Sequence, residues 1–209
     1  MIPANVIKSE LYGSVVAVKI LKKEIGISDC LKVIINLSID RAKGEPWTGI
    51  GKSEDIKEVL SRRQIGPAVL LERNLRKVVS REKARDISKE IIKIASVDFL
   101  KRNIPRFDKS KILSLGENER DSYLWDIQNK FFNADAEIKM EGEDSLLLTI
   151  RRCRFVELLG KIGEGDMAPL FCEGDKLFFD EYQKEIELDR PEKLSDGGNI
   201  CDFRFRWVE

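Results

Sequence analysis

The sequence predicts an α+β fold, in which a helical N-terminal half packs on an antiparallel sheet of two hairpins with a helix between them. Apolar residues recur at helical spacing through the first half, and from Ala136 onward apolar and polar residues alternate as they do in strands. Strands and helices do not take turns along the chain, as a parallel sheet would require. We expect one domain, residues 1–209, with a mainly helical part, 1–132, and an α+β part, 133–209, that carries the cysteine motifs.

The helices of the first half are bounded by glycine and proline. Gly26 is expected to end the first helix, the pair Gly66-Pro67 to interrupt the third, and Pro105 to end the fourth. The helical segments are expected at about residues 11–26, 29–41, 53–66, 80–103 and 117–132.

The second half is expected to form two hairpins. The first pairs residues 136–140 with 145–152, and the second pairs 185–190 with 199–208. A helical turn, 155–162, and a helix that starts at Gly165-Asp166 and runs to Tyr182 lie between them. In the last strand, alternation places one set of side chains toward a core and the other toward solvent or a site: Cys201, Phe203, Phe205 and Trp207 against Asp202, Arg204 and Arg206.

Composition excludes several classes of protein. The 209 residues are 42% apolar, which is too many for a disordered chain, and no run approaches the roughly 18 apolar residues of a membrane-spanning helix. The start of the chain lacks the pattern of a secretory signal, so a cytoplasmic location and no membrane contact are expected. The chain has no histidine, which excludes Ser-His-Asp and Cys-His catalysis and every imidazole metal ligand.

The charges balance overall but not along the chain. The 37 basic residues equal the 37 acidic ones, yet residues 1–104 hold 21 basic and 13 acidic residues, and the remainder holds 16 and 24. The two halves should therefore attract each other. The basic residues sit among acids, with Trp47 as the single interleaved aromatic, so the pattern does not favour nucleic acid as a partner. A small molecule is the expected partner, and an oligomer is left open.

The four cysteines fall into two groups. Cys30 lies alone in an apolar helical face and is expected to be a small buried core residue. Cys153, Cys172 and Cys201 lie on three different elements of the second half, which a helix packed across an antiparallel sheet could bring together. Their spacings of 19 and 29 residues match no compact zinc pattern, and core cysteines remain the alternative.

Cys172 and Asp175 are spaced by about one helical turn and should share a helix face. A thiolate is the useful nucleophile, and in a chain without histidine a helix N-terminus, a cation or a metal must favour it. Asp166 and Pro169 place Cys172 in the first turns of its helix, near the positive pole. An amphipathic helix with Phe171 inward explains the same spacing equally well.

Arg204 and Arg206 are candidates for binding a substrate carboxylate in a fork-like pair. A charge ladder between Asp202 and Arg204 is the alternative. Neither arginine can share a face with Cys201 unless a bulge intervenes.

Two motifs near the C-terminus carry a resemblance to a known family. The segment 168–175 reads Ala-Pro-Leu-Phe-Cys-Glu-Gly-Asp, and the segment 194–205 reads Leu-Ser-Asp-Gly-Gly-Asn-Ile-Cys-Asp-Phe-Arg-Phe. With Cys153 upstream, they resemble the L-2-amino-thiazoline-4-carboxylic acid hydrolase family. The specific match covers about the last sixty residues, and the helical half agrees in general layout.

The resemblance implies a hydrolase that opens a small cyclic amidine or amide without a cofactor. For this reaction the resemblance implies Cys172 as nucleophile and Asp175 as general base. Cys153 and Cys201 would line the pocket, and Arg204 or Arg206 would bind the substrate carboxylate. The family also resembles, more distantly, domains of the four-vinyl-reductase type. This implies the alternative of a non-catalytic sensor that binds a small molecule, or zinc held by Cys153, Cys172, Cys201 and Asp175.

Overall fold

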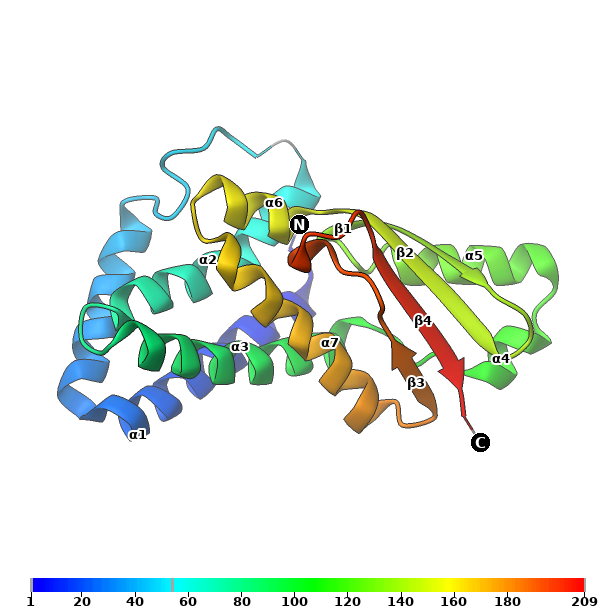
Figure 1. Ribbon diagram of the computed structural model, residues 1–209, viewed down its shortest axis with the longest axis horizontal. Coiled ribbons are helices and arrows are strands. Elements are labelled where there is room, and N and C mark those ends of the chain that lie inside the picture. The colour runs from blue at the N-terminus through cyan, green and yellow to red at the C-terminus, as the bar shows by residue number, and fades with distance from the viewer. Residues whose placement is uncertain (1, 54, 209) are drawn as a thin grey trace.

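The computed structural model describes residues 2–53 and 55–208 and has the predicted α+β architecture. The helices are α1 (Ala4–Ala42), α2 (Ile56–Leu75), α3 (Arg81–Asn103), α4 (Lys109–Ser114), α5 (Glu117–Gln128), α6 (Arg154–Lys161) and α7 (Ala168–Tyr182). The strands are β1 (Ala134–Met140), β2 (Ser145–Cys153), β3 (Ile186–Asp189) and β4 (Cys201–Trp207). Figure 1 shows α1, α2 and α3 grouped on one side of the molecule and the sheet on the other, with α7 crossing between them.

The first two predicted helices form α1, which bends sharply at Gly26. Gly26 has φ of 77° and ψ of 172°, a conformation that is essentially confined to glycine. The glycine stop expected from the sequence is therefore real, although helix resumes directly after it. The bend at Gly26 divides α1 into two arms, residues 4–25 and 27–42, which run in different directions (Figure 1).

The expected interruption at Gly66-Pro67 is wrong, because α2 continues through both residues to Leu75. Burial of the residues on either side, among them Ile65 and Val69, holds the helix together across the missing proline hydrogen bond. Gly66 has a packing role, since a Cβ there would lie 3.1 Å from the indole nitrogen of Trp47. The short helix α4, which follows the N-cap Asp108, was not expected.

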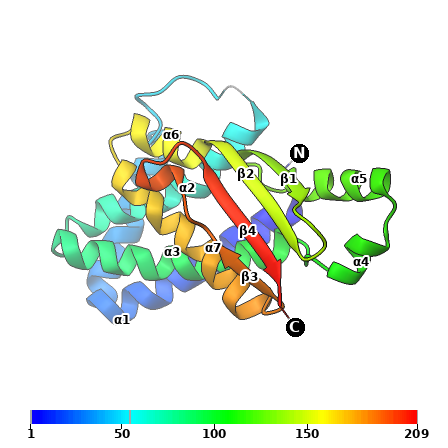
Figure 2. The same ribbon diagram turned by 45° about the vertical axis from the view of Figure 1, so that its right-hand side comes forward.

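The sheet is antiparallel throughout, in the order β1-β2-β4-β3. The two hairpins are joined where β2 pairs with β4, with Leu148 opposite Phe203. In β4 the alternation follows the prediction for Cys201, Phe203, Phe205 and Trp207, which are buried, and for Arg204 and Arg206, which are exposed. It is wrong for Asp202, which was expected on the same side as the two arginines and is buried. The turned view in Figure 2 shows the strands in front of α7.

Three clusters of buried apolar side chains form the interior. One lies under the sheet, where the strands meet α5, α7 and Phe107. Another lies among α1, α2 and α3 and contains Cys30, which is fully buried as expected. The third joins α2, α3 and α6 to the start of α7. Cys153 packs against both the first and the third cluster, so the end of β2 lies where sheet and helices meet.

Helix α7 lies between α3 and the sheet. Phe178 and Phe179 pack into the cluster under the sheet, and Gly174 lies directly against Ser96 of α3. A Cβ on residue 174 would overlap the Cβ of Ser96, so the two helices approach as closely as they do only because position 174 has no side chain. Packing against α3 on one side and the sheet on the other thus fixes the position of α7.

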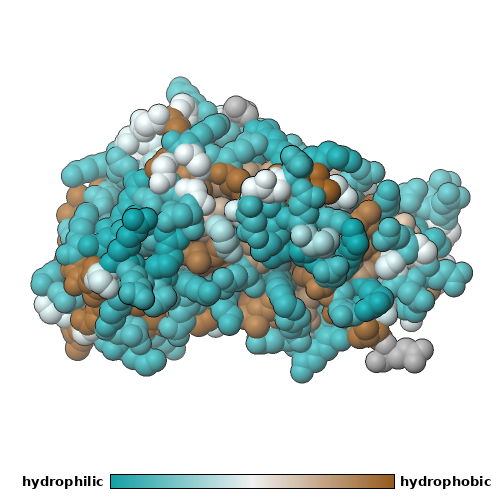
Figure 3. Space-filling model, in the orientation of Figure 1, coloured by the Kyte–Doolittle hydropathy of each residue, from teal (hydrophilic) through white to brown (hydrophobic). Residues whose placement is uncertain are grey.

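Ion pairs connect the basic first half to the acidic second half, as the charge asymmetry predicts. Arg73 lies 2.9 Å from Glu164, Arg85 lies 2.6 Å from Asp166, and Lys89 lies 2.9 Å from Glu173. The face seen in Figure 3 is covered mainly by hydrophilic residues, with small hydrophobic patches between them. None of the helices in residues 2–53 and 55–208 is both long and apolar enough to cross a membrane.

We predict that Gly174→Ala lowers the free energy of unfolding by about 1–3 kcal/mol, because the added methyl group must push Ser96 and α3 away. Thermal and urea unfolding measure the change. Gly160→Ala in α6 is the matched control, since a Cβ at that position meets nothing within 4 Å, and it should be neutral or stabilising. Equal stabilities of the two variants would contradict the close contact.

Candidate functional site

Helix α7 presents Cys172 and Asp175 on one side, one turn apart, as the spacing predicts. A short 3-10 turn, Gly165–Met167, precedes the helix, and Pro169 lies in its first turn, where a missing N–H costs nothing. Glu173 points elsewhere and pairs with Lys89 of α3. The thiol and the carboxylate therefore face the segment between β3 and β4, whereas the side chain of Glu173 lies toward α3.

Arg190, which follows β3 directly, is the central cation of this region. Its Nη1 lies 2.9 Å from Oδ2 of Asp175, and its Nη2 donates to the backbone oxygen of Cys172 at 2.9 Å. The guanidinium also lies 4.9 Å from the centre of the Phe203 ring, a cation–π contact. The side chain of Arg190 is 11% exposed and that of Asp175 is 26% exposed, so this ion pair is largely withdrawn from water.

The three cysteines of the second half gather around this pair. Cys153 ends β2, and Cys201 begins β4 in the register that places it opposite Ile150 of β2. The electrostatic environment of the Cys153 thiol includes Cys201 and Asp175, and that of Cys172 includes Cys153 and Arg190. The predicted assembly of thiols by a helix packed across the sheet is therefore present, and all four cysteines of the chain are free thiols.

The segment between Arg190 and β4 closes over Cys172 and Cys201. Ser195 Oγ lies 3.5 Å from the Cys172 thiol, and the backbone N–H of Leu194 donates to the Cys201 sulfur at 3.3 Å. Gly197 has φ of 89°, and a Cβ on Gly198 would lie 2.6 Å from Cγ of Glu192. The double glycine thus makes a tight turn directly before β4.

Burial raises the pKa of Cys172 to about 12 and that of Cys153 to about 11. The negative charge of Asp175 adds to the rise at Cys172, while Ser195 and Arg190 oppose it. The pKa of Cys201 is also raised, again mainly by burial. Cys172 is the fifth residue of α7, within its first two turns as predicted, but burial raises the pKa of its thiol and so opposes the thiolate that the helix pole would favour.

Burial also raises the pKa of Asp175 to about 6, although Arg190 acts in the opposite direction. A carboxyl group with such a pKa can accept a proton and return it near neutral pH. Of the groups predicted from the sequence, Asp175 is therefore the one whose surroundings suit acid–base chemistry.

Arg204 and Arg206 lie away from this cluster, on the opposite face of β4. Arg204 pairs with Asp202 at 2.7 Å, which is the charge-ladder alternative, and Arg206 pairs with Glu187 of β3. Both side chains are more than half exposed. No bulge interrupts the pairing of β4 with β2 or β3, so these arginines cannot turn toward Cys201.

No group of three or more Cys, Asp or Glu side chains in the described ranges, 2–53 and 55–208, is arranged to hold a metal ion. The set considered for zinc, Cys153, Cys172, Cys201 and Asp175, is close in space without forming such a group. The carboxylate of Asp175 is engaged by Arg190 instead.

Sequence reasoning missed Arg190 and the contact of Ser195. Arg190 is one of 37 basic residues, and its position after a strand and before Pro191 does not distinguish it. Ser195 lies in the same sequence motif as Cys201, and this closeness in sequence was the signal that could have identified it.

We predict that stability depends on pH through Asp175. Since its folded pKa is raised, the stability it contributes is complete below about pH 4 and is lost as pH rises through about 6. The unfolding free energy of wild type minus that of Asp175→Asn should fall by up to about 3 kcal/mol from pH 4 to pH 7. Urea unfolding at each pH measures it. Glu173→Gln, on the same helix, should retain the wild-type profile, and a flat or rising difference would contradict the raised pKa.

We also predict slow alkylation of the clustered thiols. Because alkylation requires the thiolate, iodoacetamide at pH 7.5 should modify Cys153 and Cys172 about 100-fold more slowly in the folded protein than in urea. Peptide mass spectrometry over time gives the rate at each cysteine. A folded-state rate for Cys172 within a few-fold of the unfolded rate would show an accessible, acidic thiol instead.

Comparison with solved structures finds H-NOX proteins. The Fe(II) unliganded H-NOX protein from K. algicida is 14% identical, with a TM-score of 0.40, over 93% of this chain and 94% of that one. A second structure, described as probing heme distortion in the H-NOX family, is 18% identical, with a TM-score of 0.32, over 93% and 92%. Similarities of this size carry no argument about function. No curated protein matches the chain.

Comparison with protein families gives one match that covers most of the chain. The model described as L-2-amino-thiazoline-4-carboxylic acid hydrolase matches residues 61–205. This range runs from α2 to β4 and includes Cys153, Cys172, Asp175, Arg190 and Cys201. The chain belongs to the L-2-amino-thiazoline-4-carboxylic acid hydrolase family.

Proposed function

We propose that this protein is a hydrolase that opens a small cyclic amidine or amide, of the kind represented by 2-amino-thiazoline-4-carboxylate. The observation that supports this most directly is the largely buried pair of Asp175 and Arg190, whose guanidinium also donates to the backbone oxygen of Cys172. All three residues lie within the range matched by the family model. The pair supplies a proton acceptor and a fixed positive charge in a region from which water is largely withdrawn.

The reaction consumes one water and needs no oxidant. Water attacks the ring carbon that is bonded to sulfur and nitrogen, and Asp175 accepts one of its protons. Asp175 passes this proton to the ring nitrogen as its double bond to carbon becomes single. It then accepts the second proton as the new carbonyl forms and delivers it to the ring atom that departs. Cleavage of the carbon–sulfur bond gives N-carbamoyl-cysteine, and cleavage of the carbon–nitrogen bond gives S-carbamoyl-cysteine.

Cys172 has two possible roles in this scheme. As a nucleophile, it attacks the same ring carbon after its proton passes to Asp175, and the bond from that carbon to the ring sulfur or nitrogen breaks as the departing atom takes the proton from Asp175. Water then hydrolyses the bond between Cys172 and this carbon, which gives the carbamoyl product and returns a proton to the thiol. As lining, it holds the substrate beside the water that Asp175 activates. The raised pKa of the thiol makes Asp175 indispensable in the first role, because little thiolate is present without a base.

Arg190 is the proposed cation for the substrate carboxylate. A guanidinium has five N–H donors, and the hydrogen bonds to Asp175 and Cys172 use two of them in this structure. Arg190 thus replaces Arg204 and Arg206, which the sequence had suggested as the cations that bind the substrate carboxylate. Cys153 and Cys201 retain their proposed role as neighbouring thiols that line the site.

The proposal is tested by incubating wild type and variants with 2-amino-thiazoline-4-carboxylate and following the gain of one water by mass spectrometry. Asp175→Asn should lower kcat/KM by about 100-fold or more, as loss of a general base does. Glu173→Gln is the matched control and should keep wild-type activity. Wild-type kcat/KM should rise with pH to a plateau above about 6, where Asp175 is ionised. Equal activity of Asp175→Asn and Glu173→Gln would refute the assigned base.

Cys172→Ser and Cys172→Ala separate the two roles of the thiol. If Cys172 is the nucleophile, both variants lose turnover and the wild type alone yields a covalent adduct on rapid acid quench. If it is lining, Cys172→Ala keeps turnover within about tenfold. Cys30→Ala, which changes a thiol in the separate helical cluster, is the control for loss of a cysteine.

The second candidate is a sensor that binds a small molecule without turning it over. The raised pKa values of Cys153, Cys172 and Cys201 favour it, since protonated thiols are poor nucleophiles. A rise in melting temperature with the thiazoline carboxylate, without ring opening, would support this candidate over the hydrolase.

A further inference from the structure

A cavity of about 390 Å³ lies in the helical half, apart from the cysteine cluster. Residues of both arms of α1, of α2 and of α3 line it, together with Phe171 of α7. The bend at Gly26 makes this cavity possible, because it directs residues 34–41 back toward the space that residues 6–21 also face. Its volume lies in the range of small-molecule pockets.

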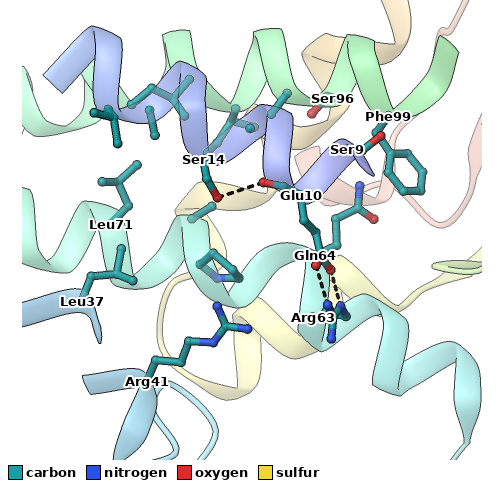
Figure 4. Close-up of a pocket in the computed structure, with 18 of the residues that line it drawn as sticks. Ser9, Glu10, Ser14, Leu37, Arg41, Arg63, Gln64, Leu71, Ser96 and Phe99 are labelled. Carbon is teal, nitrogen blue, oxygen red and sulfur yellow. Dashed lines mark hydrogen bonds and ion pairs between the residues drawn. The ribbon is translucent and has the colours of Figure 1, made fainter. Parts of the chain in front are cut away.

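The wall of the cavity is mainly apolar. Its apolar side chains come from all four helices and include Val18, Leu37, Leu71, Ile91 and Phe99. Figure 4 shows Leu37 and Leu71 at one end of the cavity and Phe99 at the other. Such a wall suits a hydrocarbon or an aromatic body and offers little to a sugar or a nucleotide.

A few polar groups interrupt this wall, and among them the hydroxyl of Ser9 is the one that is both buried and without a partner in residues 2–53 and 55–208. The hydroxyl of Ser9 is buried, with the residue 6% exposed, and makes no hydrogen bond there. The guanidinium of Arg41 has no ion pair or hydrogen bond with the described residues, and Figure 4 shows it extending from the end of α1 toward the cavity. A buried hydroxyl without a partner points to a ligand that carries an acceptor. Arg41 is exposed, so its lack of a protein partner shows only that its charge is free to pair with an anion.

The other charged groups of the cavity neutralise each other. Arg63 and Glu10 face one another in a two-pronged ion pair, drawn in Figure 4, and Ser14 donates to the backbone oxygen of Glu10 at 2.9 Å. Arg41 therefore contributes the uncompensated positive charge of the lining. An anionic group of a ligand would be placed beside it.

We propose that this cavity binds a small, mainly apolar molecule that carries one carboxylate, with the carboxylate on Arg41 and the apolar body among α1, α2 and α3. The site is distinct from the proposed hydrolytic site, because none of Cys153, Cys172, Asp175, Arg190 and Cys201 lines it. The proposed ligand site can therefore be tested independently of the hydrolase proposal.

The test uses octanoate as the probe and octan-1-ol as its uncharged analogue, with isothermal titration calorimetry and melting temperature as readouts. Octanoate should bind the wild type saturably and raise its melting temperature, and octanol should bind about tenfold more weakly. Arg41→Gln should lower octanoate affinity about tenfold and leave octanol binding unchanged. Lys43→Gln removes an equal charge two residues away, outside the lining, and should behave as the wild type.

Ala68→Phe fills part of the cavity and should abolish binding of both probes. Because this variant adds volume next to the core, its melting temperature without ligand is measured first. Arg41→Gln changes an exposed side chain, so it decides the question even if Ala68→Phe does not fold. Absence of saturable octanoate binding to the wild type, or equal affinity of wild type and Arg41→Gln, would overturn the proposal.

Discussion

The contact between α7 and α3 at Gly174 is the constraint on which the remaining structure depends. Because position 174 carries no side chain, α7 can lie against Ser96 on one side while Phe178 and Phe179 fill the cluster under the sheet on the other. The same helix carries Cys172 and Asp175, which therefore reach the ends of β2 and β4 at fixed distances. A one-residue slip of α7 would separate the thiol and the carboxylate from Arg190.

Charge pairing reinforces this packing at the start of α7. Glu164 and Asp166, in the turn before the helix, are bound by arginines of α2 and α3, among them Arg73 and Arg85. Glu72 of α2 is fully buried and pairs with Arg85 at 2.9 Å. Partly buried pairs that share partners hold geometry better than isolated surface pairs do. The opposite charges of the two halves thus have a structural purpose, which is to hold the helical half against the helix that carries the site.

The sequence allowed the architecture and part of the site to be predicted, for physical reasons that differ from residue to residue. Alternation in β4 gave the inward face of Cys201 and Phe203 because strand geometry has a strict period of two. The spacing of Cys172 and Asp175 gave a shared helix face in the same way. These are local properties, and local periodicity is what a sequence displays directly.

The features that could not be predicted depend on contacts between distant segments. Arg190 meets Asp175 only because β3 returns beside α7, which no spacing within either segment reveals. The protonation of Cys172 required a comparison of the helix pole with burial, and burial is known only once the sheet covers α7. Pro67 failed to break α2 because the apolar residues around it are buried, a tertiary effect that overrides local preference.

The placement of Arg190 has a consequence for local motion. Arg190 extends from β3, a strand of four residues at the edge of the sheet that pairs with β4 alone. Short edge strands open at lower free energy than the strands between them, and amide hydrogen exchange detects such openings. Arg190 directly follows this strand, so an opening that extends to Arg190 would leave the carboxylate of Asp175 without its counter-charge. The charge balance of the site thus depends on how often one short strand opens. Hydrogen exchange at the amides of Ile186–Asp189 measures the frequency of that opening.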